Sequence, residues 1–184
     1  ALATRIAAGE AEMALGGRRK VVAVLFADVV AFTPFAEKAA PEDVSAFLNE
    51  LFGILSEVVF RHDGVVDKFL GDCIMAVFGA MDEADPAEAA RRAVAASEDM
   101  HRFVAASAPS WQDRFGFDVH VGIGVALGDA VVGNLGSERR MEFTAVGDAV
   151  NVAARLETLA RPGQTLVTHA VASQTDEFVF RSLG

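Results

Sequence analysis

The chain has 184 residues, of which 52% are hydrophobic, and its formal net charge is −10. These values fit one globular domain with a sizeable core. They argue against a nucleic-acid binder, because a phosphate backbone requires a basic surface. The single cysteine, Cys73, excludes an intramolecular disulfide and fits a reducing, cytoplasmic compartment. No apolar run reaches the roughly 20 residues that span a bilayer, although a longer protein could carry a membrane anchor elsewhere.

The first elements are a linker, a strand and a helix. Residues 1–19 are expected to be a helical, signal-transmitting linker from an upstream sensor, and residues 20–184 a globular domain. A buried strand should end near Ala27. Apolar residues recur at helical spacing over 41–60 and predict the clearest helix.

The middle of the chain predicts a hairpin and a second helix. Gly71-Asp72 is a turn pair that can join two strands. Asp85-Pro86-Ala87-Glu88 predicts a helix start, with Asp85 as the N-cap and Glu88 closing a capping box. This helix is expected to end near Ala105.

The last third returns to strands. Residues 117–127 alternate, and one face carries Gly122 and Gly124, which would let another backbone come close. A β-rich segment should extend to Val146, and Asp148 is expected to cap a third helix that ends at 161–163. A short strand, a short helix and the start of another strand should follow.

The element order β-α-β-β-α-β predicts an α+β fold of the ferredoxin-like kind. We expect a central, mostly antiparallel sheet flanked by helices, with a β-hairpin arm and a C-terminal αβ extension.

Two aspartates suggest phosphate chemistry. Asp28 follows an apolar strand, and Asp72 lies at the hairpin turn. Converging carboxylates would suit Mg²⁺, which takes oxygen ligands. The turn after Asp28 should also point free backbone N–H groups at phosphate oxygens. Alternatively, Asp28 only caps a helix and Asp72 is ordinary turn chemistry; Lys68 would then be an edge-strand lysine that deters aggregation.

Two side chains on the third helix strengthen the phosphate interpretation. Asn151 and Arg155 are four residues apart and share a face, which we expect to be buried. A guanidinium there requires an anion, and phosphate matches its geometry. The alternative is an ion pair with an internal carboxylate. Arg139 and Arg140 are further phosphate-ligand candidates, or part of a solvated loop.

Three collinear motifs now carry a resemblance to a known family. They are LFADVVAFT at 25–33, DKFLGD at 67–72 and FTAVGDAVNVAARL at 143–156. Together they closely resemble the catalytic domain of class III nucleotidyl cyclases, in particular the bacterial adenylyl cyclases with a Lys/Thr pair. The resemblance covers about residues 20–184, and three motifs in the right order make it specific.

The resemblance implies a role for each motif residue. Asp28 and Asp72 would hold two Mg²⁺ or Mn²⁺ ions, helped by the Val29 carbonyl. The other roles are phosphate binding by the backbone N–H groups of Phe32 and Thr33, purine reading by Lys68 and Thr144, ribose orientation by Asn151, transition-state stabilisation by Arg155, and triphosphate binding by Arg139.

The resemblance also implies ATP as substrate, cyclic AMP and pyrophosphate as products, and a homodimer with two shared sites. Thr144, where many members carry Asp, resembles a subgroup that includes bicarbonate-responsive cyclases. The family usually has a further basic residue on a late strand, and we expect the sequence to end before it. The alternatives are a non-catalytic nucleotide-binding regulatory domain and a guanylyl cyclase. A diguanylate cyclase would require a Gly-Gly-(Asp/Glu)-Glu-Phe loop, which the sequence lacks.

Overall fold

One mostly antiparallel sheet forms the centre of the fold. The computed structural model describes residues 16–82, 84–137 and 139–183. The strands follow the order β2-β3-β1-β4-β5, and β6 pairs with β4 in parallel. Their bounds are β1 Gly16–Val29, β2 Val65–Leu70, β3 Cys73–Phe78, β4 Val121–Ser137, β5 Arg140–Val146 and β6 Thr165–Val167.

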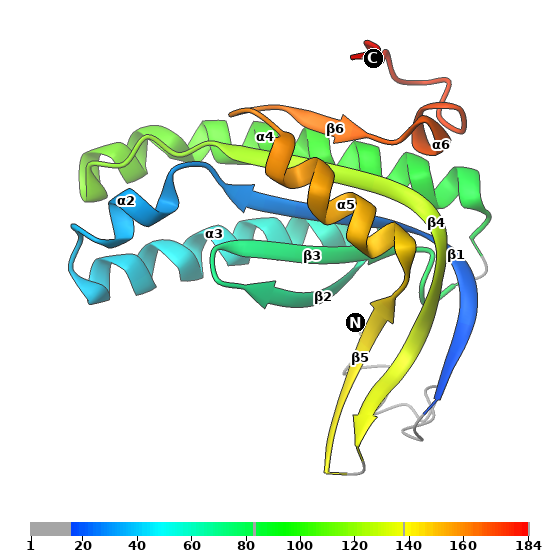
Figure 1. Ribbon diagram of the computed structural model, residues 1–184. Helices are drawn as coiled ribbons and strands as arrows, with labels where there is room; N and C mark the ends of the chain where they lie inside the picture. Colours follow the sequence, from blue (N-terminus) through cyan, green and yellow to red (C-terminus); the bar gives the residue numbers. More distant parts are fainter. Residues whose placement is uncertain (1–15, 83, 138, 184) are drawn as a thin grey trace.

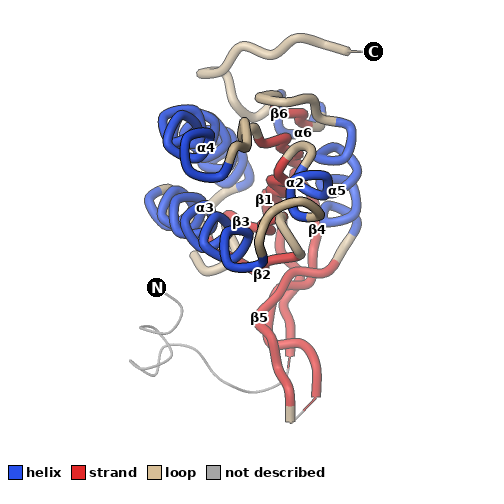
Figure 2. The backbone as a smooth tube through the Cα atoms, turned by 90° about the vertical axis from the view of Figure 1, so that its left-hand side faces the viewer, coloured by secondary structure: helices blue, strands red, loops and turns tan. Residues whose placement is uncertain are grey.

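Helices cover both faces of this sheet. They are α2 Phe32–Ala36, α3 Pro41–Arg61, α4 Pro86–Phe115, α5 Asp148–Leu159 and α6 His169–Ala172. The long helices α3 and α4 lie on one face, and α5 crosses the other (Figures 1 and 2). The lower parts of β4 and β5 extend beyond these layers as a hairpin arm (Figure 1). The predicted α+β class, flanking helices and hairpin arm are confirmed.

The alternation of side chains along β1 supplies both cores. Ala23, Leu25 and Ala27 belong to the core on the α3–α4 side. Val22, Val24 and Phe26 belong to the core on the α5 side. Since successive side chains point to opposite faces of a strand, an apolar run without polar interruption requires cover on both faces.

The helix α4 is longer than the sequence predicts. It continues ten residues beyond the expected end near Ala105, to Phe115, and passes through Pro109. Trp111 explains the extension, because its side chain is buried against Phe47, with 5.3 Å between ring centroids. The Trp111 indole also donates a hydrogen bond to Glu50. Tertiary packing therefore overrides the helix-breaking tendency of proline.

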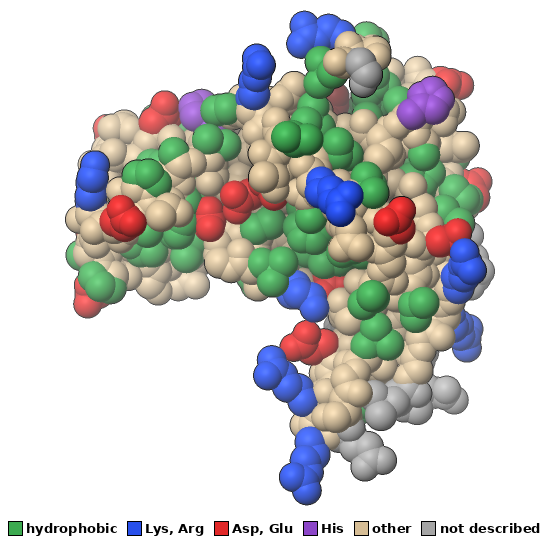
Figure 3. Space-filling model, viewed as in Figure 1, with side chains coloured by type: hydrophobic (Ala, Val, Ile, Leu, Met, Phe, Trp, Pro, Cys, Tyr) green, Lys and Arg blue, Asp and Glu red, His purple; other side chains and the backbone are tan. Residues whose placement is uncertain are grey.

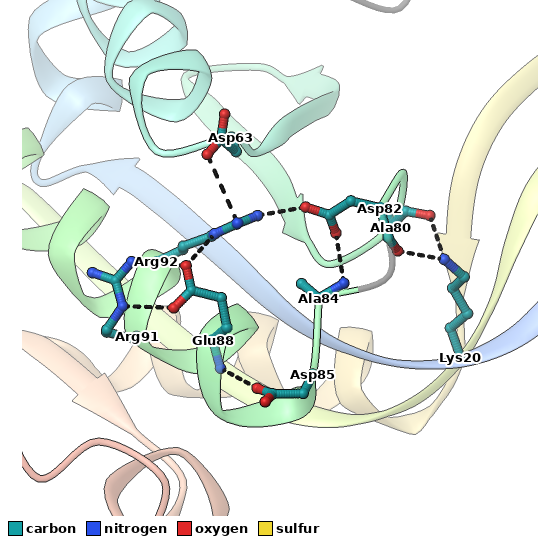
Figure 4. A network of polar contacts seen from close by, with 9 residues as sticks. All are labelled: Lys20, Asp63, Ala80, Asp82, Ala84, Asp85, Glu88, Arg91 and Arg92. Atoms are coloured by element: carbon teal, nitrogen blue, oxygen red, sulfur yellow. Dashed lines mark hydrogen bonds and ion pairs between the residues drawn. The ribbon is translucent and has the colours of Figure 1, made fainter. Parts of the chain in front are cut away.

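A polar network fixes the connection between β3 and α4 (Figure 4). The Asp85 side chain accepts a hydrogen bond from the Glu88 backbone N–H at 2.8 Å, which confirms the predicted N-cap. The Glu88 carboxylate instead binds Arg91 and Arg92. From β1, Lys20 donates to the backbone carbonyls of the loop, including that of Asp82 at 2.8 Å. The network attaches the loop to both helix and sheet.

The glycine face of β4 lets α5 approach closely, as predicted. A Cβ atom at Gly124 would lie 2.3 Å from both the Ala153 carbonyl oxygen and the Glu157 backbone nitrogen. Both neighbours are backbone atoms of α5, so the helix is seated directly on the strand.

Several expected boundaries differ from the observed ones. β1 begins at Gly16, so residues 16–19 are strand, and the helix expected over 1–15 lies outside the described residues. β4 begins at Val121 rather than 117. Asp148 is the first residue of α5 and not its cap, because the chain enters the helix through an extended Gly147. No strand follows α6 in the described residues 173–183.

Candidate active site

Asp28 and Asp72 meet at one end of the sheet. Asp28 is near the end of β1, and Asp72 lies in the tight turn between β2 and β3, where Gly71 has φ +66°. Their side chains share a hydrogen bond. Burial, followed by repulsion from Asp72 and Glu157, raises the pKa of Asp28 to about 7. Burial also raises the pKa of Asp72, which accepts the shared proton.

This pair suits a cation whose remaining ligands come from a bound substrate. Two half-buried carboxyl groups that retain a proton near neutral pH lack enough nearby positive charge to stabilise both of them in the ionised form. Within the described ranges, no group of three or more His, Cys, Asp or Glu side chains could hold a metal by itself. Mg²⁺ is commonly bound through one or two carboxylates together with substrate phosphates. The donor set therefore fits this metal.

The turn after Asp28 presents backbone N–H groups. Ala31, at the N-cap of α2, has φ 59° and no side-chain cap follows. Phe32 and Thr33 open the helix, so their N–H groups have no partner within it. Val29, which precedes the turn, is buried. The N–H groups of Phe32 and Thr33 therefore lie in the segment that directly follows Asp28 and the end of β1.

Lys68 and Thr144 are brought together by a residue that the sequence did not single out. Asp67, on β2, accepts hydrogen bonds from the Thr144 hydroxyl at 2.9 Å and from the Ala145 N–H at 2.9 Å. The Lys68 ammonium lies 3.4 Å from both Asp67 and Glu142. The predicted pair is therefore assembled within one chain, with Thr144 buried and Lys68 partly exposed.

Asp67 and Glu157 were the residues missed by sequence reasoning. The Asp67 side chain is only 2% exposed, yet a charged residue on an edge strand ordinarily faces solvent. Its position beside Lys68 in the motif is the one signal that could have identified it. Glu157 repels both aspartates, but its position near them depends on how α5 crosses the sheet.

Asn151 and Arg155 are exposed rather than buried, which corrects the expectation from the sequence. Their helix buries the opposite side, through Ala149 and Ala153. In the described part of the chain Arg155 has no ion-pair partner, so the internal carboxylate proposed as an alternative is not observed. The pKa shifts of Asp28 and Asp72 are caused mainly by burial, and neither Arg155 nor another positively charged side chain is among their main causes.

Arg139 is separated from the aspartate pair. It is exposed at the connection between β4 and β5, and this end of the arm projects away from the body of the molecule (Figures 1 and 2). Basic side chains are spread along the arm on the face shown in Figure 3. One chain therefore does not bring Arg139 to Asp28 and Asp72.

Known proteins share both the sequence and this fold. Residues 17–184 match the family described as the adenylate and guanylate cyclase catalytic domain. Adenylate cyclase 1 of Rhizobium meliloti is 38% identical over 177 residues, which cover 92% of this chain and 26% of that protein. An uncharacterised protein of Mycobacterium tuberculosis, Rv1318c, is 40% identical over 93% of this chain and 30% of its own length. The chain thus spans about a quarter to a third of these relatives.

Solved structures give the same result. The adenylyl cyclase CyaB from P. aeruginosa has a TM-score of 0.83 at 30% identity, covering 87% of this chain and 82% of that one. The guanylyl cyclase Cya2 has a TM-score of 0.82 at 32% identity, covering 87% and 80%. The described part of the chain contains no helix that is long and apolar enough to cross a membrane. The chain belongs to the adenylate and guanylate cyclase catalytic domain family, the class III nucleotidyl cyclases.

Proposed function

We propose that the chain is an adenylyl cyclase domain, which converts ATP to 3′,5′-cyclic AMP and pyrophosphate. The observation that carries the choice of ATP is the Lys68–Asp67–Thr144 arrangement. The Lys68 ammonium can donate to N1 of adenine, and Thr144 can accept from the exocyclic amine of adenine. Relatives of both specificities resemble this chain, so the purine-reading residues decide between them.

The roles of the other residues follow from the chemistry. Asp28, Asp72 and the Val29 carbonyl would hold two Mg²⁺ or Mn²⁺ ions, which when bound activate the attacking ribose 3′-oxygen and neutralise the leaving pyrophosphate. The N–H groups of Phe32 and Thr33 would bind phosphate oxygens. The remaining contribution of the protein is positioning and electrostatic stabilisation.

We further propose that two chains share each site. One chain would supply Asp28 and Asp72. Its partner would supply the purine pair Lys68 and Thr144, together with Asn151 to orient the ribose and Arg155 to stabilise charge at the α-phosphate. Two observations support this division: Arg155 is exposed without an ion-pair partner among the described residues, and Arg139 is remote from the aspartates. A symmetric homodimer would then contain two equivalent sites. An upstream sensor and a response to bicarbonate stay predictions.

Product analysis tests the proposal. The purified chain at high concentration, with ATP and Mn²⁺, should yield cyclic AMP and pyrophosphate, and Asp72→Ala should lower the rate by at least about a hundredfold. The double variant Lys68→Glu, Thr144→Cys should shift preference toward GTP. ATP binding without any product would favour the regulatory-domain alternative, and an unchanged preference in the double variant would contradict the purine assignment.

A further inference from the structure

Asp67 is a buried carboxylate at an irregularity of β2. The register between β2 and β3 shifts between Val66 and Lys68, so Asp67 is the extra residue of a β-bulge. A bulge redirects the side chain that it carries. Here the Asp67 side chain reaches β5, where it is 2% exposed and contacts Thr144 and Ala145.

Three donors surround this carboxylate. The Thr144 hydroxyl lies 2.9 Å from each of its oxygens. The Ala145 backbone N–H donates to Oδ2 at 2.9 Å, and the Lys68 ammonium is 3.4 Å from Oδ1. A carboxylate anion can only accept hydrogen bonds, and three donors offset its burial.

The contact removes the ambiguity of the Thr144 hydroxyl. A free hydroxyl can donate one hydrogen or accept through its lone pairs. With its hydrogen directed to Asp67, Thr144 retains only acceptor capacity toward a ligand. Adenine presents an amine donor at the position where guanine presents a carbonyl acceptor. An acceptor-only hydroxyl therefore favours adenine and disfavours guanine.

We propose that Asp67 is a positioning residue for nucleotide selection, which fixes the Thr144 hydroxyl as an acceptor, so that the site prefers ATP to GTP. The inference rests on the proposed adenylyl cyclase function and deepens it. Asp67 itself need not touch the nucleotide.

The variant Asp67→Asn tests the proposal with little change in shape. Its amide oxygen can still accept from Ala145, while its amide nitrogen donates to the Thr144 oxygen and lets the hydroxyl hydrogen turn toward a ligand. We expect the ratio of kcat/KM for ATP to that for GTP to fall about tenfold, because one hydrogen bond changes polarity. A purely structural role for Asp67 would lower both values together.

Two further variants separate the hydroxyl from the lysine. Glu142→Gln removes the other carboxylate near Lys68. Because the Glu142 side chain is 51% exposed, this variant should change the ATP-to-GTP ratio of kcat/KM by less than about twofold. Thr144→Val removes the hydroxyl, so Asp67→Asn should have no further effect on the ratio in that background. An effect of Asp67→Asn that survives Thr144→Val, or that Glu142→Gln reproduces, would overturn the proposal.

Binding of unreactive ATP and GTP analogues supplies a second measurement if the variant has little activity. Asp67→Asn should narrow the difference between the two dissociation constants, and an unchanged difference counts against the inference. Failure of the proposed function has a different result: the unsubstituted chain would form no cyclic AMP, or would prefer GTP.

Discussion

Asp28 and Asp72 share a proton that each would lose readily in water. Burial of the Asp28 carboxyl, then repulsion from Asp72 and Glu157, and then the hydrogen bond to Asp72 raise the pKa of Asp28 to about 7. The sequence indicated this convergence because an apolar strand leads to Asp28 and a hairpin turn carries Asp72, although β2, which precedes that turn, is partly exposed and not the buried strand expected there. It did not predict Asp67, since the burial of that residue depends on a bulge and on contact with a strand 77 positions away, which no local pattern encodes.

The aspartate pair predicts a pH-dependent stability in the absence of metal. The pKa of Asp28 is raised from 3.8 to about 7 on folding, so between these values the folded chain binds more protons than the unfolded chain. Stability from this group is complete below about pH 4 and is lost as the pH rises through about 7. A pKa shift of this size corresponds to about 4 kcal/mol of unfolding free energy for a fully buried group. Because Asp28 is only half-buried, solvent screening lowers the expected contribution to about 1–2 kcal/mol.

Denaturant unfolding in chelator at pH 5 and pH 8 measures this loss. The free energy of unfolding of Asp28→Asn should change less between pH 5 and pH 8 than that of the unsubstituted chain. Adding Mn²⁺ at pH 8 should raise the Tm of the unsubstituted chain and not that of the variant. An identical pH dependence in both proteins would contradict the assigned pKa.

At the scale of elements, the contact between β4 and α5 determines where Asn151 and Arg155 stand. The glycine alternation predicted a close approach, but only the fold shows that α5 is the element that uses it. Conversely, the end of α4 could not be predicted, because Trp111 and the Arg114–Glu50 ion pair hold the turns beyond Pro109. Local propensity fails where distant contacts stabilise the backbone.

Substitution of Gly124 by Ala should therefore displace α5. The new Cβ would meet two α5 backbone atoms at 2.3 Å, so we expect a loss of about 1–3 kcal/mol in the free energy of unfolding and reduced activity. Gly53→Ala is the matched control: this exposed glycine lies within α3 with nothing within 4 Å of an added Cβ. The control should gain about 0.5–1 kcal/mol. Equal stability of the two variants would refute this account of the contact.

For the whole molecule, the division of residues between two half-sites leads to complementation. Asp28→Ala and Asn151→Ala should each be inactive, because each variant homodimer lacks one half of both sites. After mixing, random exchange makes about half of the dimers mixed, and each has one intact site, so about a quarter of full activity should return. The measurement is cyclic AMP formation before and after mixing.

A mixture of Asp28→Ala with Asp72→Ala is the control for this experiment. Both substitutions affect the same half-site, so no dimer contains an intact site and activity should stay absent. Recovery in the control mixture, or none in the test mixture, would exclude the shared arrangement.

The early start of β1 has a mechanical consequence. Gly17 pairs with Gly133 of β4, and Gly133 pairs with Thr144 of β5. A Cβ at Gly133 would collide with the backbone of Gly16 and Gly17, so the three strands are closely packed at this point. Asp28 lies eleven residues further along β1, about 35–40 Å away in an extended strand. A pull or twist applied to residue 16 thus acts first on β4 beside Thr144, whereas Asp28 lies near the far end of the same β1–β4 ladder.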